Sequence, residues 1–243
     1  MYQIGALRAI QEAGLWDDTV SISASSIGVF NALVTCQYDL DQAYKMWDEL
    51  TKQPLFHNVD HMAKDYMLQM AKQSIMHEGI DVNPFLSVIE EYIDEQLVRK
   101  SNKEMIISAY NISDLKQEYH AVKNIPQGQL MLYAAASSRL PFFKNVIIDG
   151  KKYLDGGAGD NIPYYSLLDD KHFDLVILIK ISMIPYFIPR VRVTNISYDN
   201  EIIIKPSSPL GSPLEFKTPS FEKKYEMGYE DTLRALRFLG NDL

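Results

Sequence analysis

The chain has 243 residues, a formal net charge of −8, 47% hydrophobic residues and a single cysteine, Cys36, which therefore has no partner for an internal disulfide. This length and composition suit one domain and exclude disordered, collagen-like and disulfide-framework chains, while the acidic balance argues against binding of nucleic acid. Because the start lacks a signal-peptide pattern and no apolar run reaches the ~18 residues of a membrane span, we expect a cytoplasmic protein.

The first half of the chain alternates helical and extended patterns, which are recognised by apolar spacing and by capping residues. The predicted elements are a helix over 3–13 ended by Gly14, a strand over 19–24, a helix over 29–36, a helix over 40–50 capped by Asp39, and a helix opened by Asn83 as N-cap with Pro84 at the first turn. The apolar face of this last helix would consist of Leu86, Ile89, Ile93 and Leu97.

The second half of the chain contains more strands. We expect strands over 104–110, 118–122, 145–149, 151–154, 174–179 and 201–205, and helices over 128–136 and 222–239. Asp149 and Gly150 predict a tight hairpin turn between two of the strands. The continuous apolar run over 175–179 favours a strand buried on both faces. Because strands alternate with helices and no linker is evident, the sequence predicts one α/β domain.

The strand–turn–helix over 19–36 contains the sequence Ala24-Ser25-Ser26-Ile27-Gly28. It matches the G-x-S-x-G nucleophile elbow with alanine at the first position. The residues two before and two after the serine face each other across a strained turn, so only small side chains such as Ala24 and Gly28 fit. The backbone N–H of Ile27, at the start of the helix, would then stabilise an oxyanion. The alternative is a serine-rich turn without chemistry.

A nucleophilic serine needs a base. The five histidines, His57, His61, His77, His120 and His172, do not stand in a recognisable active-site context. A conspicuous acid is Asp155, which precedes Gly156 and Gly157 at the end of a predicted strand. Carboxylates at such strand ends can be catalytic, because the loops there border the crevice of an α/β fold. The alternative is a turn aspartate that hydrogen-bonds its own backbone.

Taken together, these motifs resemble those of the patatin-like phospholipases, which are lipid acyl hydrolases with a Ser-Asp dyad and no catalytic histidine. The resemblance extends over nearly the whole chain. The matching segments are residues 2–7, 23–28, 31–32, 135–138, 141–143, 148–150, 155–157, 160–163 and 228–231.

The resemblance implies a three-layer α/β/α fold with a mainly parallel central sheet, formed by residues 1–243 as one domain. It also implies that Ser26 is the nucleophile and Asp155 the base, and that neither a metal nor an organic cofactor takes part. The family's Gly-rich oxyanion loop and first strand would precede Tyr2, so we expect the domain to be short at its N-terminus by this strand and loop.

The function implied is hydrolysis of lipid acyl esters, of the phospholipase A or lysophospholipase type, through an acyl-enzyme. Two alternatives stay open, namely an impaired lipid- or protein-binding module that lacks the oxyanion loop, and a general carboxylesterase. A lipid or acyl-ester substrate and transient contact with a membrane surface are the expected partners, whereas the sequence does not define the oligomeric state. The apolar segments that could meet a lipid are the stripe of Met62, Tyr66, Met67 and Met70, the pairs Phe142-Phe143 and Tyr164-Tyr165, and residues 183–189 followed by Arg190 and Arg192.

Overall fold

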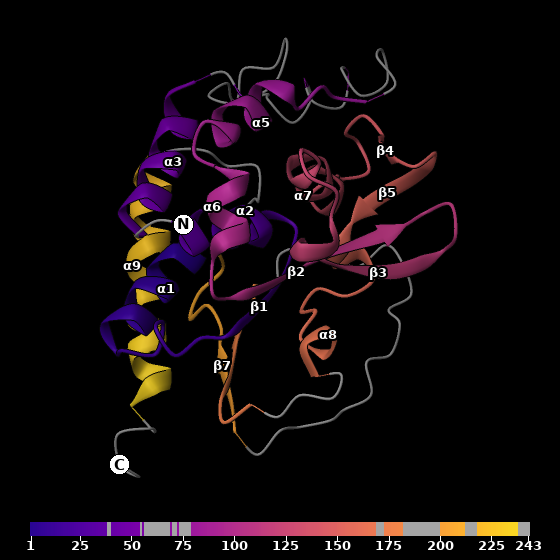
Figure 1. Cartoon of the computed structure of the whole chain (residues 1–243). Helices are drawn as coiled ribbons and strands as arrows, with labels where there is room; N and C mark the ends of the chain where they lie inside the picture. The colour runs from indigo at the N-terminus through magenta and orange to yellow at the C-terminus, as the bar shows by residue number, and fades with distance from the viewer. Residues whose placement is uncertain are drawn as a thin grey trace.

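The computed structural model describes residues 1–37, 40–53, 55, 69, 72, 79–168, 173–181, 200–211 and 218–237. These ranges contain both helices and strands, and most of the helices lie on one side of the larger sheet (Figure 1). The larger hydrophobic core cluster includes Phe30, Leu33, Leu50 and Ile107, all fully buried. A smaller cluster joins the first helix to the strands near the C-terminus.

The larger sheet is organised around β2 (Glu104–Asn111), which is paired along both of its edges. One edge carries β3 (Lys116–Ala121), antiparallel to β2 from Ile106 to Asn111. The other edge is shared by β1 (Ser21–Ser25), which runs parallel to β2 as far as Ser108, and β5 (Lys151–Asp155), which runs antiparallel as far as Ala109. Because Ser108 and Ala109 are consecutive, the C-terminal ends of β1 and β5 meet at one point of the sheet.

The remaining strands are β4 (Val146–Ile148), antiparallel to β5, and the separate parallel pair β6 (Val176–Ile179) and β7 (Glu201–Ile204). The α/β fold is confirmed, but the larger sheet is mixed. Parallel pairing holds for β1–β2 and β6–β7, whereas the β2–β3, β2–β5 and β4–β5 pairs are antiparallel. The tight turn at Asp149 and Gly150 explains part of this difference, because a two-residue hairpin can join only antiparallel strands. Both turn residues have positive φ, 50° and 75°, as the predicted turn requires.

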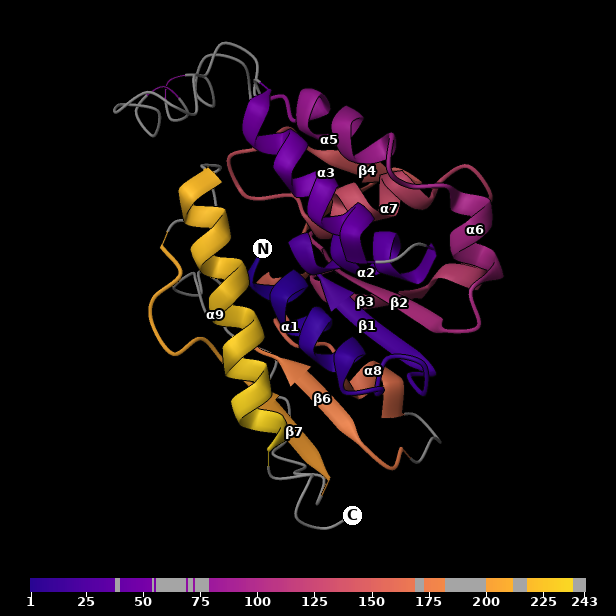
Figure 2. The same ribbon diagram turned by 90° about the vertical axis from the view of Figure 1, so that its left-hand side faces the viewer.

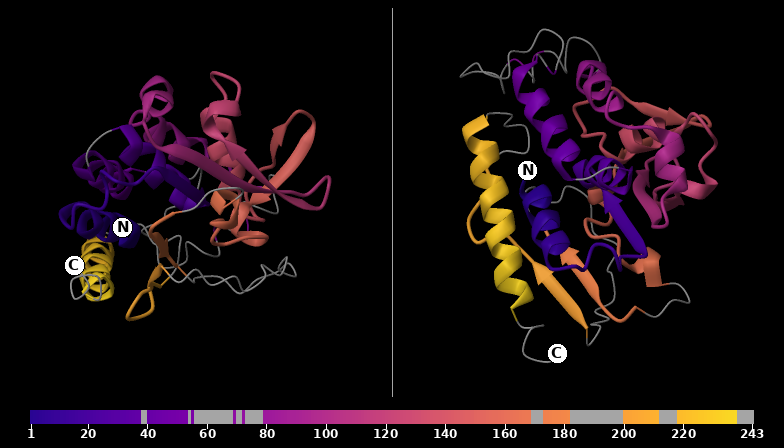
Figure 3. Two further views of the ribbon diagram at one scale, coloured as in Figure 1. Left: turned by 60° about the horizontal axis from the view of Figure 1, so that its bottom comes forward. Right: turned by 60° about the vertical axis from the view of Figure 1, so that its left-hand side comes forward.

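The helices pack against the sheet and against each other. Those in the first part of the chain are α1 (Tyr2–Glu12), α2 (Ile27–Gln37), α3 (Leu40–Lys52), α5 (Asn83–Glu90) and α6 (Glu95–Lys100). The others are α7 (Leu130–Ser137), α8 (Tyr165–Leu168), α9 (Thr218–Leu236) and the 3-10 turns η1 (Val122–Asn124) and η2 (Gly156–Ala158). α2 packs on β1, α7 on β2, β4 and β5, and α9 on α1 and β7 (Figures 2 and 3).

Two glycines allow α1 and α9 to approach closely. A Cβ added to Gly5 would lie 1.9 Å from the carbonyl oxygen of Tyr225, and one added to Gly228 would lie 2.0 Å from that of Tyr2. The buried hydroxyl of Tyr2 also donates a hydrogen bond of 3.0 Å to Asp231. The N-terminal helix is therefore fixed to the C-terminal helix by backbone contact as well as by apolar packing.

Replacing Gly5 by alanine is expected to lower the free energy of unfolding by about 3 kcal/mol, because the added methyl group must push two helix backbones apart. Gly14→Ala is the control. Gly14 ends α1 at φ 76°, with no atom within 4 Å of an added Cβ, so only backbone strain of about 1 kcal/mol is expected. Urea unfolding of both variants measures the difference, and equal losses would contradict the close-packing argument.

Most predicted elements are confirmed within a few residues, but the start of the helix after residue 80 is not. The predicted N-cap, Asn83, is instead the first helical residue, and Val82 occupies the cap position without a side-chain hydrogen bond. The carboxylate of Asp81 accepts the backbone N–H of Asn83 at 2.9 Å. Pro84 lies in the first turn, as expected. The aspartate two residues earlier thus accepts the N–H of Asn83 itself, while the N–H of Leu86, one of those that an Asn83 cap would have accepted, donates to the carbonyl oxygen of Val82 at 2.9 Å.

The predicted apolar face of this helix is also wrong in its second half. α5 ends at Glu90, and α6 begins after Asp94, whose side chain accepts the backbone N–H groups of the next turn. Ile93 and Leu97 therefore do not continue the face of α5. The buried side chains of α5 are Phe85, Val88 and Ile89.

The strand over 174–179 forms, but it is not buried on both faces. In β6, Val176 and Leu178 are buried, whereas Ile177 and Ile179 are only half-buried. Among the described residues, no helix is both long enough and apolar enough to cross a membrane. The predicted cap Asp39, the stripe of Met62, Tyr66, Met67 and Met70, residues 183–189, Arg190 and Arg192 lie outside the described residues.

Candidate active site

Ser26 lies in the turn between β1 and α2, at a backbone φ of 56°. Positive φ is uncommon for residues other than glycine and stores strain, which concentrates at functional turns. The flanking residues leave little room for a larger side chain at position 28. A Cβ added to Gly28 would lie 3.8 Å from the Cβ of Ala24 and 3.2 Å from the side-chain nitrogen (Nε2) of Gln3. Ser26 thus occupies a strained turn between small residues, as the sequence predicts.

Asp155 ends β5, and each of its carboxylate oxygens has a different partner. Oδ2 accepts a hydrogen bond of 2.5 Å from the hydroxyl of Ser26, and Oδ1 accepts one of 2.8 Å from the backbone N–H of Gly157. A Cβ on Gly156 would lie 2.1 Å from the carbonyl oxygen of Ser108, so no larger residue fits there. The carboxylate therefore bonds its own backbone with one oxygen and the serine with the other.

Burial changes the acidity of Asp155, which is only 8% exposed. Loss of solvation raises the pKa of this carboxyl to about 6, although the hydrogen bonds from Ser26 and Gly157 act in the opposite direction. A base works best when its pKa is near the working pH, and a strongly shifted carboxyl in such a place indicates a functional group.

A buried serine fixes the backbone of the turn. The N–H of Ser26 donates to both the carbonyl oxygen of Ser137, at 3.2 Å, and its hydroxyl oxygen, at 3.0 Å. The hydroxyl of Ser137 in turn donates a 2.6 Å hydrogen bond to the carbonyl oxygen of Ser108, the residue of β2 opposite the end of β1. Ser137 thus links the end of α7, the turn and the sheet.

Side chains of β3 contact both the loop after Asp155 and the neighbouring strand β2. The hydroxyl of Tyr119 donates a 2.7 Å hydrogen bond to Asp160, and the amide of Gln117 donates one of 2.5 Å to the hydroxyl of Ser108. Sequence reasoning assigned no role to Ser137, Tyr119 or Gln117. Ser137 lies in one of the segments that resemble the family, but the contacts of all three residues join positions between 9 and 111 residues apart, so local patterns do not indicate these contacts.

A family model described as patatin-like phospholipase matches residues 1–168 of the chain, well over half of its length. The chain belongs to the patatin-like phospholipase family. This family consists generally of hydrolases that act on lipid acyl esters. Both the family and the α/β/α fold class expected from the sequence are therefore confirmed.

Comparison with curated proteins gave no match. Among solved structures, VipD from Legionella pneumophila is similar, with a TM-score of 0.55 and 14% sequence identity. The similarity covers 96% of this chain but only 64% of VipD, so the patatin-like chain spans less than two thirds of that protein. At this low identity the comparison shows a shared fold.

The start of α2 supplies the hydrogen-bond donors nearest to Ser26 in sequence. The first N–H groups of a helix have no partner within the helix, so those of Ile27 and Gly28 can donate to an anion. That the N–H of Ile27 stabilises an oxyanion stays a prediction, because this charge exists only while a substrate reacts in the site.

His120 is the one histidine among the described residues of this patatin-like chain. It lies in β3, 3.4 Å from Glu118, and its ring packs edge-on against Tyr133 and Tyr153. Burial lowers its pKa, which opposes a positive charge there. The other histidines lie outside the described ranges, and within those ranges no three His, Cys, Asp or Glu residues gather as a metal site.

Replacing Ser137 by alanine is expected to lower kcat for ester hydrolysis about 100-fold, because a displacement of ~1 Å at a nucleophile has effects of this size. Loss of the hydrogen bond to Ser108 should also cost about 1–2 kcal/mol of stability. Ser138→Ala is the matched control, because the hydroxyl of Ser138 is buried without a hydrogen-bond partner among the described residues. Steady-state kinetics and urea unfolding should show no loss for Ser138→Ala, and equal effects of the two variants would contradict a positioning role of Ser137.

Proposed function

We propose that this protein hydrolyses lipid acyl esters with Ser26 as nucleophile and Asp155 as general base. The observation that carries the proposal is the 2.5 Å hydrogen bond between the hydroxyl of Ser26 and Oδ2 of Asp155, at the point where β1 and β5 meet. A base within hydrogen-bond reach is what activates a serine nucleophile, and this contact places Asp155 there. The strained backbone of Ser26 and the second hydrogen bond of Asp155 hold both groups in place.

In the first step, the hydroxyl oxygen of Ser26 attacks the carbonyl carbon of the ester while Asp155 accepts the hydroxyl proton. The negative charge that develops on the carbonyl oxygen is stabilised by the N–H of Ile27 at the start of α2. The C–O bond to the alcohol then breaks. The proton moves from Asp155 to the departing alkoxide, which leaves an acyl group on Ser26 and the carboxylate restored.

In the second step, Asp155 accepts a proton from water, whose oxygen attacks the acyl carbon. The bond to Ser26 breaks, the proton returns to the serine oxygen, and a fatty acid is released. The same carboxylate thus serves both steps. The pKa of about 6 keeps it mostly ionised at neutral pH without making it too weak a base.

The proposed substrates are phospholipids or lysophospholipids, which the family membership supports at the level of lipid acyl esters. Because such substrates lie in membranes or micelles, we propose that the protein contacts membrane surfaces transiently. The cytoplasm, expected from the sequence, is the proposed location.

The first test is labelling with a fluorophosphonate probe, which reacts with activated serine nucleophiles. The purified chain should be labelled, and Ser26→Ala should not. Without any Ser26-dependent adduct, the chain would instead be a lipid- or protein-binding module.

The second test compares a short-chain phosphatidylcholine below its critical micelle concentration, where it is a soluble monomer, with the same ester as micelles, so that the leaving group is unchanged. A lipid hydrolase should turn over the micellar ester faster. Faster turnover of the soluble ester would favour the general carboxylesterase.

A further inference from the structure

Among the large apolar side chains that the structure describes, Leu115 is the most exposed, at 74%. It is the last residue of the turn between β2 and β3, and its backbone φ is 54°. Glycine and asparagine adopt this left-handed conformation at the lowest cost, and a leucine is uncommon there. The turn therefore carries an apolar side chain at a position where both solvent exposure and backbone conformation favour a different residue.

The hairpin of β4 and β5 lies beside this turn and is bonded to it. The hydroxyl of Ser113 accepts the backbone N–H of Lys152 at 3.0 Å, and the carboxylate of Asp114 accepts a 2.6 Å hydrogen bond from the ammonium of Lys151. Directly across from Lys152 in β4 is Ile147, which is 53% exposed. Residues 111–118 and 146–153 thus form one projecting part of the molecule, here called the hairpin edge (Figures 1 and 3).

The hairpin edge lies at the same end of the larger sheet as the proposed dyad. β1 and β2 run parallel toward this end. β5 ends with Asp155 opposite Ala109 of β2, and β2 itself ends two residues later, at Asn111. At about 3.3 Å per residue, the hairpin edge begins about 7 Å past the base along β2. A surface that touched the hairpin edge would therefore face the end of the sheet that holds the dyad.

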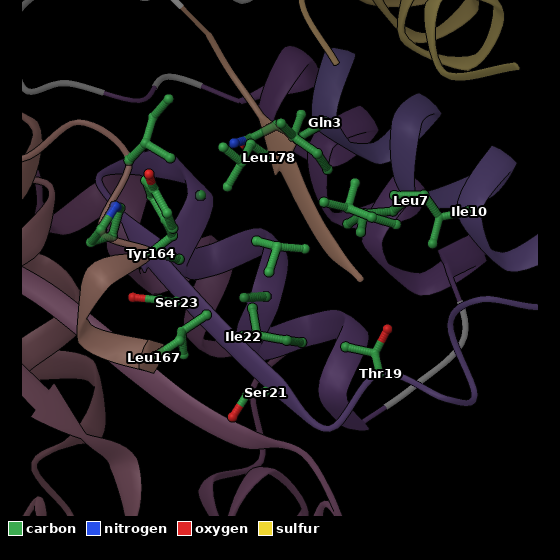
Figure 4. Close-up of a pocket in the computed structure, with 18 of the residues that line it drawn as sticks. Gln3, Leu7, Ile10, Thr19, Ser21, Ile22, Ser23, Tyr164, Leu167 and Leu178 are labelled. Atoms are coloured by element: carbon green, nitrogen blue, oxygen red, sulfur yellow. The ribbon is translucent and has the colours of Figure 1, made fainter. Parts of the chain in front are cut away.

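Another exposed apolar side chain, that of Val20, lies at the opposite end of the sheet. It is 59% exposed and directly precedes β1, and its carbonyl oxygen accepts the N–H of Glu104 at the start of β2. Val20 borders a cavity of about 680 Å³ between β1 and β6, which Ser21, Ile22 and Ser23 also line (Figure 4). No residue of the hairpin edge lines this cavity. Val20 is therefore a suitable comparison for Leu115, because the full length of β2 separates it from the hairpin edge.

The charges of the hairpin edge indicate what kind of partner it suits. Its charged residues are three lysines and three acids, namely Lys116, Lys151, Lys152, Asp114, Glu118 and Asp149. The hairpin edge is thus neutral, and the rest of the chain carries the whole net charge of −8. Lysine can lay its carbon chain on an apolar surface while its ammonium stays in water, which suits the boundary of a bilayer. Interfaces between proteins are instead poor in lysine.

The amount of exposed apolar surface on the hairpin edge also favours a lipid surface over a protein. Stable interfaces between proteins bury about 1,200–2,000 Å² in total, of which two side chains flanked by lysines supply only a small part. A bilayer makes no such demand, because every apolar group that leaves water for the lipid boundary adds to the binding. Two exposed side chains at a projecting edge are therefore enough for weak, reversible binding.

We propose that the hairpin edge is the surface by which this protein docks on phospholipid membranes, with Leu115 inserted at the boundary between headgroups and acyl chains and Ile147 beside it. The choice of a lipid surface rests on the proposed function. Because the hairpin edge is neutral, its partner is a bilayer of zwitterionic phospholipid such as phosphatidylcholine. Docking turns the end of the sheet that holds the dyad toward the bilayer, from which an ester substrate would come.

The test measures co-sedimentation of the full chain with phosphatidylcholine vesicles, in a Ser26→Ala background so that the vesicles stay intact. Leu115→Asn should lower the partition coefficient about tenfold, because a polar side chain of similar size replaces the inserted one. Val20→Thr is the matched control, since it also replaces an exposed apolar side chain by a polar one of similar size, and it should change the coefficient less than about twofold. Urea unfolding should show Leu115→Asn to be at least as stable as its parent, because asparagine tolerates positive φ better than leucine.

Equal vesicle binding by Leu115→Asn and its parent would overturn the proposal, and so would an equal loss in Val20→Thr or the absence of any binding by the parent. Binding that requires phosphatidylserine and disappears in about 0.5 M NaCl would assign the contact to charge and overturn the role of the apolar side chains. A smaller oligomer of Leu115→Asn in sedimentation velocity, with unchanged vesicle binding, would assign the hairpin edge to a second copy of the chain and overturn the membrane contact. Because vesicle binding is measured without ester turnover, the membrane surface can fail while the proposed hydrolysis stands, and the reverse.

Discussion

Ser26→Ala should lower kcat for ester hydrolysis by about 10⁴-fold or more while KM changes little. Removal of a serine nucleophile has effects of this size in other serine hydrolases. The hydroxyl oxygen forms its bond to substrate only in the transition state, so its loss affects the chemical step rather than binding. Initial rates over a range of p-nitrophenyl ester concentrations separate kcat from KM.

Ser25→Ala is the matched control for this experiment. Ser25 ends β1 directly before the nucleophile, and alanine keeps the Cβ that lies near Gly156. Its turnover should stay within about threefold of the unchanged chain, as expected for a half-buried side chain outside the chemistry. If Ser26→Ala kept the rate of Ser25→Ala, another nucleophile would be responsible for the activity.

The parts of the site that could be predicted are those set by neighbouring residues. The turn at Ser26 depends on Ala24 and Gly28, and the turn after Asp155 depends on Gly156 and Gly157, so both are visible as short patterns. That Ser26 and Asp155 meet depends instead on β1 and β5 sharing one edge of β2, at registers that end on consecutive residues. Only the resemblance to a family joined these two residues at the level of sequence.

In the rest of the fold too, features set by neighbouring residues were predictable from the sequence, whereas features set by distant residues were not. The hairpin turn at Asp149 and Gly150 was predictable from two residues. The antiparallel pairing of β5 with β2 was not, because it joins segments more than 40 positions apart. The half-burial of Ile177 arises from the cavity beside β6, which no property of the strand's own sequence reveals.

Asp155→Asn should stabilise the fold at neutral pH while it lowers turnover about 10³-fold, the scale of general-base catalysis. The folded-state pKa of about 6 exceeds the ordinary 3.8, because burial disfavours the carboxylate. Below pH ~3.8 the carboxyl of Asp155 is protonated in both the folded and the unfolded state, so its burial does not lower the free energy of unfolding. Between ~3.8 and ~6 only the folded state keeps the proton, so stability falls as pH rises. Above pH ~6 the carboxylate is ionised in both states, and its burial lowers the free energy of unfolding by about 3 kcal/mol, which corresponds to a pKa shift of about two units.

The stability of Asp155→Asn relative to the unchanged chain should therefore rise from near zero at pH 3.5 to about 3 kcal/mol at pH 7. Urea unfolding across this range measures it. In the unchanged chain, kcat/KM should fall below pH ~6 as Asp155 gains its proton.

Asp114→Asn provides a control of opposite sign, because the hydrogen bond from Lys151 lowers the pKa of Asp114. That variant should lose stability relative to the unchanged chain as pH rises through the acid range. A gain for Asp155→Asn that is independent of pH would show that burial of the carboxylate is not its cause, and would remove the physical basis for a general base poised near neutrality.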